Sequence, residues 1–251
     1  MRVTGLVVMV VAGLWFGGCR SATTPAQSPP QSQPAAQPEP GLLQLAPAVT
    51  PARPETPMVT VQEGDGEISL FDGQTLGQWK ATDFGGQGDV AVKDGAIHMA
   101  MGSYMTGITW TGPVVRMDYE ITLEAMRVEG HDFFCGLTFP VGEKPCTLVL
   151  GGWGGSLCGL SSIDSFDASE NETTKMMSFE NGKWYRVRLR VVPDRIQAWL
   201  DDEDLVDVDI TGKTLSIRLE VEESQPLGIA TWNTAGAVRN IKLKKLADEA
   251  Q

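Results

Sequence analysis

A two-residue period in hydrophobicity most strongly limits the folds open to this chain. Over positions 117–125, five apolar residues alternate with Asp, Glu, Thr and Glu. Over 185–191, apolar residues alternate with three arginines. Because successive side chains of a strand point to opposite faces of a sheet, both runs predict strands with one buried face. No convincing 3.6-residue period occurs beyond residue 65, so we expect an all-β domain.

Turn residues cut the rest of this region into short strands. Pro193-Asp194 separates 185–191 from the alternating run 196–200 and predicts a hairpin. About twelve such strands at short intervals are typical of a two-sheet antiparallel jelly-roll sandwich of the concanavalin or laminin-G kind. The polar stretch 164–175 is interpreted mainly as a loop. Further strands are expected at 133–139, 147–150, 157–161 and 206–210.

The first nineteen residues have the anatomy of a signal peptide. Arg2 precedes the apolar run Val3–Phe16, and Gly17-Gly18-Cys19 follows it. Small residues before a cysteine resemble a bacterial lipobox, so we expect residues 1–19 to end at a lipidated Cys19. An ordinary secretory signal and an uncleaved anchor are the alternatives, although the run is shorter than the ~20 residues of a spanning helix. The expected location is the bacterial cell envelope, periplasmic or outer surface, with the lipid as the sole membrane contact.

A proline-rich segment separates this signal from the domain. Ten of the fifteen prolines lie between Pro25 and Pro57, among Ala, Gln, Ser and Thr. Such a composition buries too little apolar surface to offset the entropy of ordering, so residues 20–64 are predicted to be a disordered tether. A single folded domain over 65–247 and a short tail at 248–251 complete the expected organisation.

Charge narrows the choice of partners. The formal net charge is −12, and it belongs to the domain, because residues 1–64 carry three Arg and three Glu. An acidic domain repels phosphate backbones and anionic lipid, so nucleic acid is not expected as a partner. A neutral ligand such as a carbohydrate fits this charge.

Familiar catalytic and metal motifs are absent from the sequence. It has no GxSxG elbow, P-loop, dinucleotide fingerprint, HExxH or CxxC spacing. With only His98 and His131 available, a multi-histidine metal site is excluded. Cys135, Cys146 and Cys158 lie in apolar runs, where cysteine usually acts as a small hydrophobe. One disulfide among them remains open, without an assignable pairing.

Three segments could carry chemistry. His131, at a loop-to-strand junction, could act as a general base, or could be an incidental residue of a surface turn. Trp153, inside the glycine-rich stretch 151–156, could be displayed to stack on a sugar ring, or could fold back into the core.

The third segment is the acidic stretch 161–172. Asp164, Glu170 and Asn171 could bind sugar hydroxyls, and Glu170 is a second candidate for the catalytic base. The carboxylates could also hold a divalent cation such as Ca²⁺, although no EF-hand spacing is present. The alternative is a solvated acidic loop. We expect Trp153, His131 and residues 164–172 to converge at one mouth of the sandwich.

Motifs at both ends of the domain resemble the 3-keto-disaccharide hydrolase family. They are Phe71-Asp72-Gly73 with Leu76 and Trp79, Asp94-Gly95, Gly182-Lys183-Trp184, and Arg239-Asn240-Ile241. The resemblance implies a secreted or periplasmic concanavalin-like jelly roll that acts on 3-keto-glycosides. The middle departs from the family pattern, because residues 132–137 and 147–149 replace its usual Asn-Ser-Gly-Ile and Glu-x-Gln elements. The chain is therefore interpreted as a divergent member.

The chemistry implied by the resemblance is removal of a C2 proton and loss of the C1 group. It needs one base and one stabiliser of the enediolate, instead of the paired acids of an ordinary glycosidase. Two other classes stay open: a non-catalytic carbohydrate-binding module and a structural envelope protein. Ionisable groups beside exposed aromatics favour the enzyme, whereas aromatics alone favour the binding module.

Overall fold

The computed structural model describes residues 66–247, and this part of the chain is an all-β sandwich of two antiparallel sheets. The expected signal peptide, Cys19 and the tether lie outside the described residues. Within 66–247, no helix has the length and apolar character needed to cross a membrane. The all-β class with two antiparallel sheets, predicted from the sequence, is confirmed.

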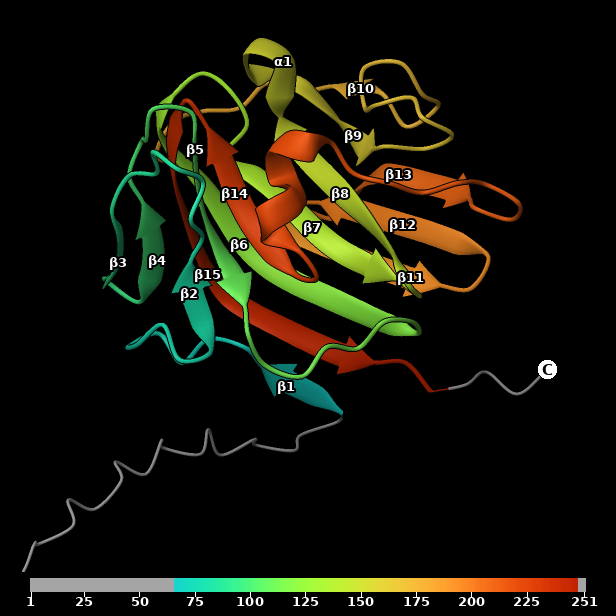
Figure 1. The fold of residues 1–251 in the computed structure, drawn as a ribbon, viewed down its shortest axis with the longest axis horizontal. Helices are drawn as coiled ribbons and strands as arrows, with labels where there is room; N and C mark the ends of the chain where they lie inside the picture. The colour runs from blue at the N-terminus through green and yellow to red at the C-terminus, as the bar shows by residue number, and fades with distance from the viewer. Residues whose placement is uncertain (1–65, 248–251) are drawn as a thin grey trace, which may run out of the picture. The chain divides into compact units, whose positions relative to one another are not determined.

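The eight-stranded sheet has the order β13-β12-β11-β6-β15-β4-β3, with β1 paired to β15 (Figure 1). Its long strands are those with two-residue alternation, and β6 and β11 pair along eight residues. The strand predicted from residue 117 begins at Tyr119, because Asp118 has a positive φ of 55°, which is incompatible with extended strand backbone. The strands are β1 (Glu67–Ser69), β3 (Val90–Lys93), β4 (Ala96–Met99), β6 (Tyr119–Gly130), β11 (Trp184–Val192), β12 (Arg195–Leu200), β13 (Glu203–Asp209) and β15 (Thr234–Lys245).

The seven-stranded sheet has the order β10-β9-β8-β7-β14-β5-β2. It contains the apolar runs expected as inner strands, and its outer face bears the site described below. The strands are β2 (Trp79–Ala81), β5 (Met105–Trp110), β7 (Cys135–Val141), β8 (Lys144–Gly151), β9 (Leu157–Ser161), β10 (Lys175–Met176) and β14 (Gly228–Trp232).

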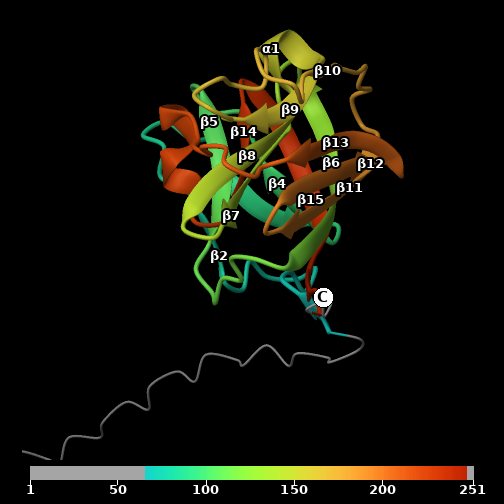
Figure 2. The same ribbon diagram turned by 90° about the vertical axis from the view of Figure 1, so that its right-hand side faces the viewer.

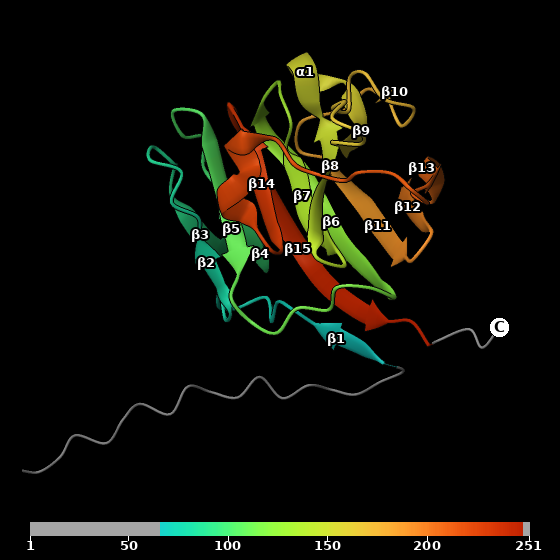
Figure 3. The ribbon, with the colours of Figure 1, turned by 45° about the vertical axis from the view of Figure 1, so that its right-hand side comes forward.

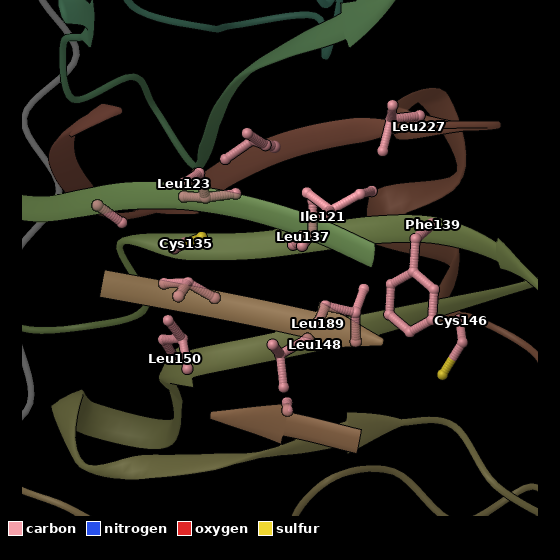
Figure 4. Close-up of a cluster of buried hydrophobic side chains, with 14 of the residues drawn as sticks. Ile121, Leu123, Cys135, Leu137, Phe139, Cys146, Leu148, Leu150, Leu189 and Leu227 are labelled. Carbon is pink, nitrogen blue, oxygen red and sulfur yellow. The ribbon is translucent and has the colours of Figure 1, made fainter. Parts of the chain in front are cut away.

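The core fills the space between the two sheets. Side chains from β7 and β8 meet those from β6 and β11, as Figure 4 shows for Leu137, Leu148, Ile121 and Leu189. All four are at most 2% exposed. Burying a leucine or isoleucine side chain stabilises a fold by ~1.5–3 kcal/mol, so this contact holds the sheets together.

The three domain cysteines belong to this core. Cys135, Cys146 and Cys158 are free and buried. Burial raises the pKa of the Cys135 and Cys146 thiols to about 12 and that of Cys158 to about 11. They therefore act as small apolar side chains, the role that their strand context predicted.

A short 3₁₀ helix, η1 (Leu219–Ser224), covers part of the outer face of the seven-stranded sheet. Figure 2 shows it on the side of this sheet that faces away from the eight-stranded sheet. Val221 packs there on Met105 and Ala230. Gly228 permits the close approach, since a Cβ at this position would collide with the Ser224 carbonyl oxygen.

Candidate functional site

One rim of the seven-stranded sheet gathers the connections that build the site. β8 ends where β7 begins, through the pair Cys135–Leu150, and β14 ends where β5 begins, through the pair Trp232–Met105. The helical turn α1 (Gly152–Gly155) follows β8 and marks this rim (Figure 3). Residues just outside these strand ends therefore lie side by side although they are far apart in sequence.

A groove of about 230 Å³ lies against this rim on the outer face of the sheet. Thr147, Val149 and Ser161 of β8 and β9 form part of its lining. These small side chains leave the outer face hollow at this place. The remaining lining residues are aromatic (Phe133, Trp153, Trp232), charged (Asp132, Arg218, Glu220) or from η1 (Val221).

Trp153 is displayed and does not fold back into the core. Its side chain is 44% exposed, and its backbone is left-handed, with φ 50° and ψ 49°. This conformation costs a non-glycine residue roughly 1–2 kcal/mol, and the flanking glycines make the surrounding turn feasible. Asp132 supports the turn, because its Oδ2 accepts a hydrogen bond from the Gly154 N–H at 3.0 Å.

Arg127 supports the same turn from inside. Its residue is only 8% exposed, and its guanidinium donates to Asn181 Oδ1 at 2.6 Å and to the carbonyls of Gly155 and Phe179. A buried guanidinium bonded in this way fixes the backbone around it. The Trp153 ring is thus presented by a braced turn.

Arg218 is the cation of the groove. It donates to Asp167 Oδ2 at 2.6 Å and to Glu220 Oε1 at 3.0 Å. Its guanidinium carbon lies 5.9 Å from the centre of the Trp153 ring. Arg218 is brought there by residues 214–216, which exchange backbone hydrogen bonds with Ser162 and Asp164.

These contacts shift the pKa values of the charged side chains at the groove. The hydrogen bond from Arg218 holds the pKa of Glu220 below its ordinary value of 4.5. Partial burial alone would raise the pKa of Asp167, but hydrogen bonds from Ser169 and Arg218 outweigh burial and lower it. The two carboxylates raise the pKa of Arg218 in turn, with Glu220 contributing most. Both carboxylates are therefore ionised at neutral pH.

The sequence-based candidates occupy different positions around this groove. Trp153 lines it, whereas His131 is exposed and absent from the lining, one residue before Asp132. The His131 segment nevertheless touches the Trp153 turn, since a Cβ on Gly155 would come within 2.5 Å of the His131 carbonyl oxygen. Glu170 is also exposed and outside the lining.

Asp164 and Asn171 fasten the acidic loop. Asp164 Oδ1 accepts from the Thr214 N–H at 2.8 Å. Asn171 donates to the carbonyls of Leu160, Phe166 and Asp167 and accepts from Thr173. These bonds tie Asp164 to residue 214 and tie Asn171 to the loop and to the end of β9. Asp167 of this loop contacts the groove through Arg218.

Arg218 and Glu220 were not foreseen from the sequence. They belong to an Arg-Leu-Glu triplet at the start of η1, and this triplet matches no known motif. The sequence analysis treated Trp232 only as part of a strand and Asp132 only as part of the loop-to-strand junction at His131. The residues 66–247 contain no group of three or more His, Cys, Asp or Glu side chains placed to hold a metal ion.

Comparison with known proteins shows that most of the chain matches one family model. Residues 66–244 match the family model described as a 3-keto-alpha-glucoside-1,2-lyase-like domain. No curated protein matches the chain.

Three of the solved structures that are similar to the chain have TM-scores below 0.5. The carbohydrate-binding module CBM66 from Bacillus subtilis is 12% identical, with 66% of this chain and 95% of that chain covered and a TM-score of 0.46. A putative glycosyl hydrolase from Parabacteroides distasonis is 14% identical, with coverages of 73% and 95% and a TM-score of 0.46. A galectin-like protein of unknown function from Bacillus subtilis is 10% identical, with coverages of 66% and 89% and a TM-score of 0.48.

Proposed function

Since the chain belongs to the family of 3-keto-alpha-glucoside-1,2-lyase-like domains, we propose that its groove binds a 3-keto-glycoside and expels the group at C1. The observation that carries this proposal is the contact of Arg218 with Glu220 beside the exposed ring of Trp153. It joins a cation, a carboxylate and a stacking surface in one groove.

The reaction needs no oxidant, because the substrate already has its keto group. A base removes the C2 proton, and the electron pair of the broken C2–H bond moves into an enediolate with its negative charge on the C3 oxygen. The C3 carbonyl then re-forms, and the electron pair of the enediolate makes a C1–C2 double bond. At the same time the C1–O bond breaks, and its electron pair stays on the leaving oxygen. That oxygen takes up a proton, and water added across the double bond yields the free 3-keto sugar.

Glu220 is the carboxylate best suited to act as the base. Asp132 uses both oxygens on backbone N–H groups, those of Phe133 and Gly154. Asp167 is held by Ser169 and Arg218. Glu220 accepts from Arg218 through Oε1, which leaves Oε2 for a substrate proton.

Arg218 is suited to stabilise the enediolate. Its charge is fixed at neutral pH, and it lies beside the ring on which the sugar would stack. A preorganised cation aimed at developing negative charge lowers a barrier by ~3–4 kcal/mol in related cases. Trp153 would bind the apolar face of the sugar, and Asp164 and Asn171 would act by holding the loop that carries Asp167.

The second candidate function is a non-catalytic carbohydrate-binding module. It is favoured by the lowered pKa of Glu220, because a carboxylate that holds its proton weakly is a weak base. The aromatic lining alone would suffice for such a module.

Incubation of the domain with 3-keto-trehalose or methyl 3-keto-glucoside, with and without divalent metal, separates the two functions. We expect the 3-keto sugar or its glucal intermediate from the wild-type domain, and a loss of at least ~100-fold in Glu220→Gln. His131→Ala and Glu170→Ala, the other candidate bases, should keep the activity. Sugar binding without product, in every metal condition, would establish the binding module instead.

Anchoring at the cell envelope is part of the proposal and rests on the sequence alone. Lipidation at Cys19 would tie the domain to the membrane by residues 20–64. Wild-type protein should partition into the membrane fraction, and Cys19→Ala should release it. Equal partitioning of the two forms would exclude the lipid anchor.

A further inference from the structure

The groove continues beyond Glu220 along the same rim of the sheet. A second cavity, also of about 230 Å³, is lined by Phe84, Tyr104 and Trp232 together with Gly85, Gly86, Met105 and Glu220. Glu220 and Trp232 border both cavities. A single ligand can therefore lie across the Arg218–Glu220 pair and occupy space on either side of it.

The aromatic residues of both cavities form a row that the sheet order dictates. Trp153 follows β8, Phe133 precedes β7, Trp232 ends β14 and Tyr104 precedes β5, and these strands are consecutive neighbours in the sheet. Backbone hydrogen bonds join the row, from the Trp232 N–H to Phe133 O and from the Asn233 N–H to Tyr104 O. Neighbouring strands lie ~4.8 Å apart, so β8 and β5, which Trp153 follows and Tyr104 precedes, are roughly 14 Å apart, more than the length of one pyranose ring.

The second cavity has a stacking surface of its own. Tyr104 is 63% exposed, and its ring centre lies 5.6 Å from that of Trp232, with an angle of 36° between the planes. Such a pair, in which Tyr104 is exposed and Trp232 half-buried, offers an apolar face with polar edges, which suits the C–H face of a sugar. Among residues 66–247, no cation lines this cavity, and Arg218 lines only the Trp153 side.

We infer that Tyr104, Trp232 and Phe84 form a second subsite, which binds the sugar ring that leaves from C1. The inference rests on the proposed function for the direction of the substrate. The 3-keto ring lies over Trp153, where Arg218 reaches its enediolate oxygen. Glu220, at the junction of the cavities, faces C2, so the group on C1 extends over Tyr104.

The test compares a disaccharide carrying a 3-keto-glucosyl ring with methyl 3-keto-glucoside. Tyr104→Ala should lower kcat/KM about tenfold for the disaccharide and less than twofold for the methyl glycoside, because only the disaccharide has a ring in the second subsite. Tyr104→Phe should restore the disaccharide rate, and Trp153→Ala should impair both substrates. Phe166→Ala is the matched control, since Phe166 is 55% exposed and lines neither cavity.

Equal effects of Tyr104→Ala on the two substrates, or no effect on either, would overturn the inference. Dependence on Tyr104 with phenyl 3-keto-glucoside but not with the disaccharide would also overturn it, in favour of an aryl leaving group. If the wild-type domain turns over no 3-keto substrate, the proposed function fails. The same comparison by calorimetric Kd then decides the subsite: Tyr104→Ala must weaken the disaccharide alone.

Discussion

The outer faces of the two sheets differ in how far their residues are buried. On the eight-stranded sheet, β6, β11 and β12 alternate between buried and half-exposed residues. On the seven-stranded sheet, every residue of β5, β7 and β9 is buried. The first sheet meets water on one side, whereas the second is covered by η1 and by the walls of the groove.

The charges on the two faces differ in the same way. On the eight-stranded sheet, Arg188 lies 3.7 Å from both the Trp199 ring centre and a Glu120 carboxylate oxygen. Arg218 at the groove has a similar set of neighbours, a Trp and two carboxylates. Arg188 also borders a hollow, of about 440 Å³, but it belongs to a strand of the sheet, whereas Arg218 is carried to the groove by a crossing segment. Both faces thus combine an arginine with a tryptophan and a carboxylate, and the groove at Arg218 differs by its further aromatic residues, Phe133 and Trp232.

The largest expected effect concerns thiols, because all three domain cysteines belong to the seven-stranded sheet. With pKa values raised from 9.0 to about 12, Cys135 and Cys146 should carry roughly a thousandfold less thiolate at pH 8 than in the unfolded chain. Iodoacetamide should label the native protein at least that much more slowly than the denatured one. Rapid labelling without denaturant would mean that this sheet opens locally.

Arginine substitutions on the two faces should differ by about two orders of magnitude in activity. Arg218→Ala removes the cation beside Trp153 and should lower kcat/KM for a 3-keto-glycoside by ~100-fold or more. Arg188→Ala removes a comparable stack on the other sheet and should leave kcat/KM unchanged. Thermal unfolding of both variants controls for folding. Similar activity losses would contradict the assignment of the groove.

The pH profile tests which carboxylate acts in the groove. Glu220 must be ionised to accept a proton, and its pKa lies below 4.5, so activity should persist as the pH falls and decline only below that value. The acid limb of kcat/KM between pH 3 and pH 8 measures this. An acid limb near neutrality, where imidazoles titrate, would remove Glu220 from the role of base.

A pair of threonine substitutions compares the two outer faces directly. The hydroxyls of Thr138 and Thr147 share a buried hydrogen bond of 2.9 Å under the groove. Thr138→Ala should cost ~1–3 kcal/mol of unfolding free energy, since it leaves the Thr147 hydroxyl without this partner. Thr122→Ala, on the half-exposed face of β6, should stay within about 0.5 kcal/mol. Equal costs in urea unfolding would show that the two faces are equally covered.

Sequence patterns predicted strands in both sheets, but they predicted which face is buried only in the eight-stranded one. The run 185–191 and the turn at Pro193-Asp194 correspond to β11 and the β11–β12 hairpin. Continuous apolar runs also predicted strands, but such runs do not say which face looks toward a groove. Of the residues proposed for the site, Trp153 lines the groove. It was recognisable in the sequence because its glycine neighbours indicate an unusual backbone. Arg218 and Glu220 gave no local signal.

The sequence alone determined the all-β class, the burial of alternate residues and the family frame, because period-two patterns and turn residues act over a few neighbouring positions. The tertiary structure decided the site. Strand order brings Tyr104, Trp153 and Trp232 to one rim, and the segment leading into η1 brings Arg218 to Asp167 across 51 positions of sequence. Such contacts depend on sheet pairing and on the closeness that Gly228 allows, and no pattern within a short window encodes them.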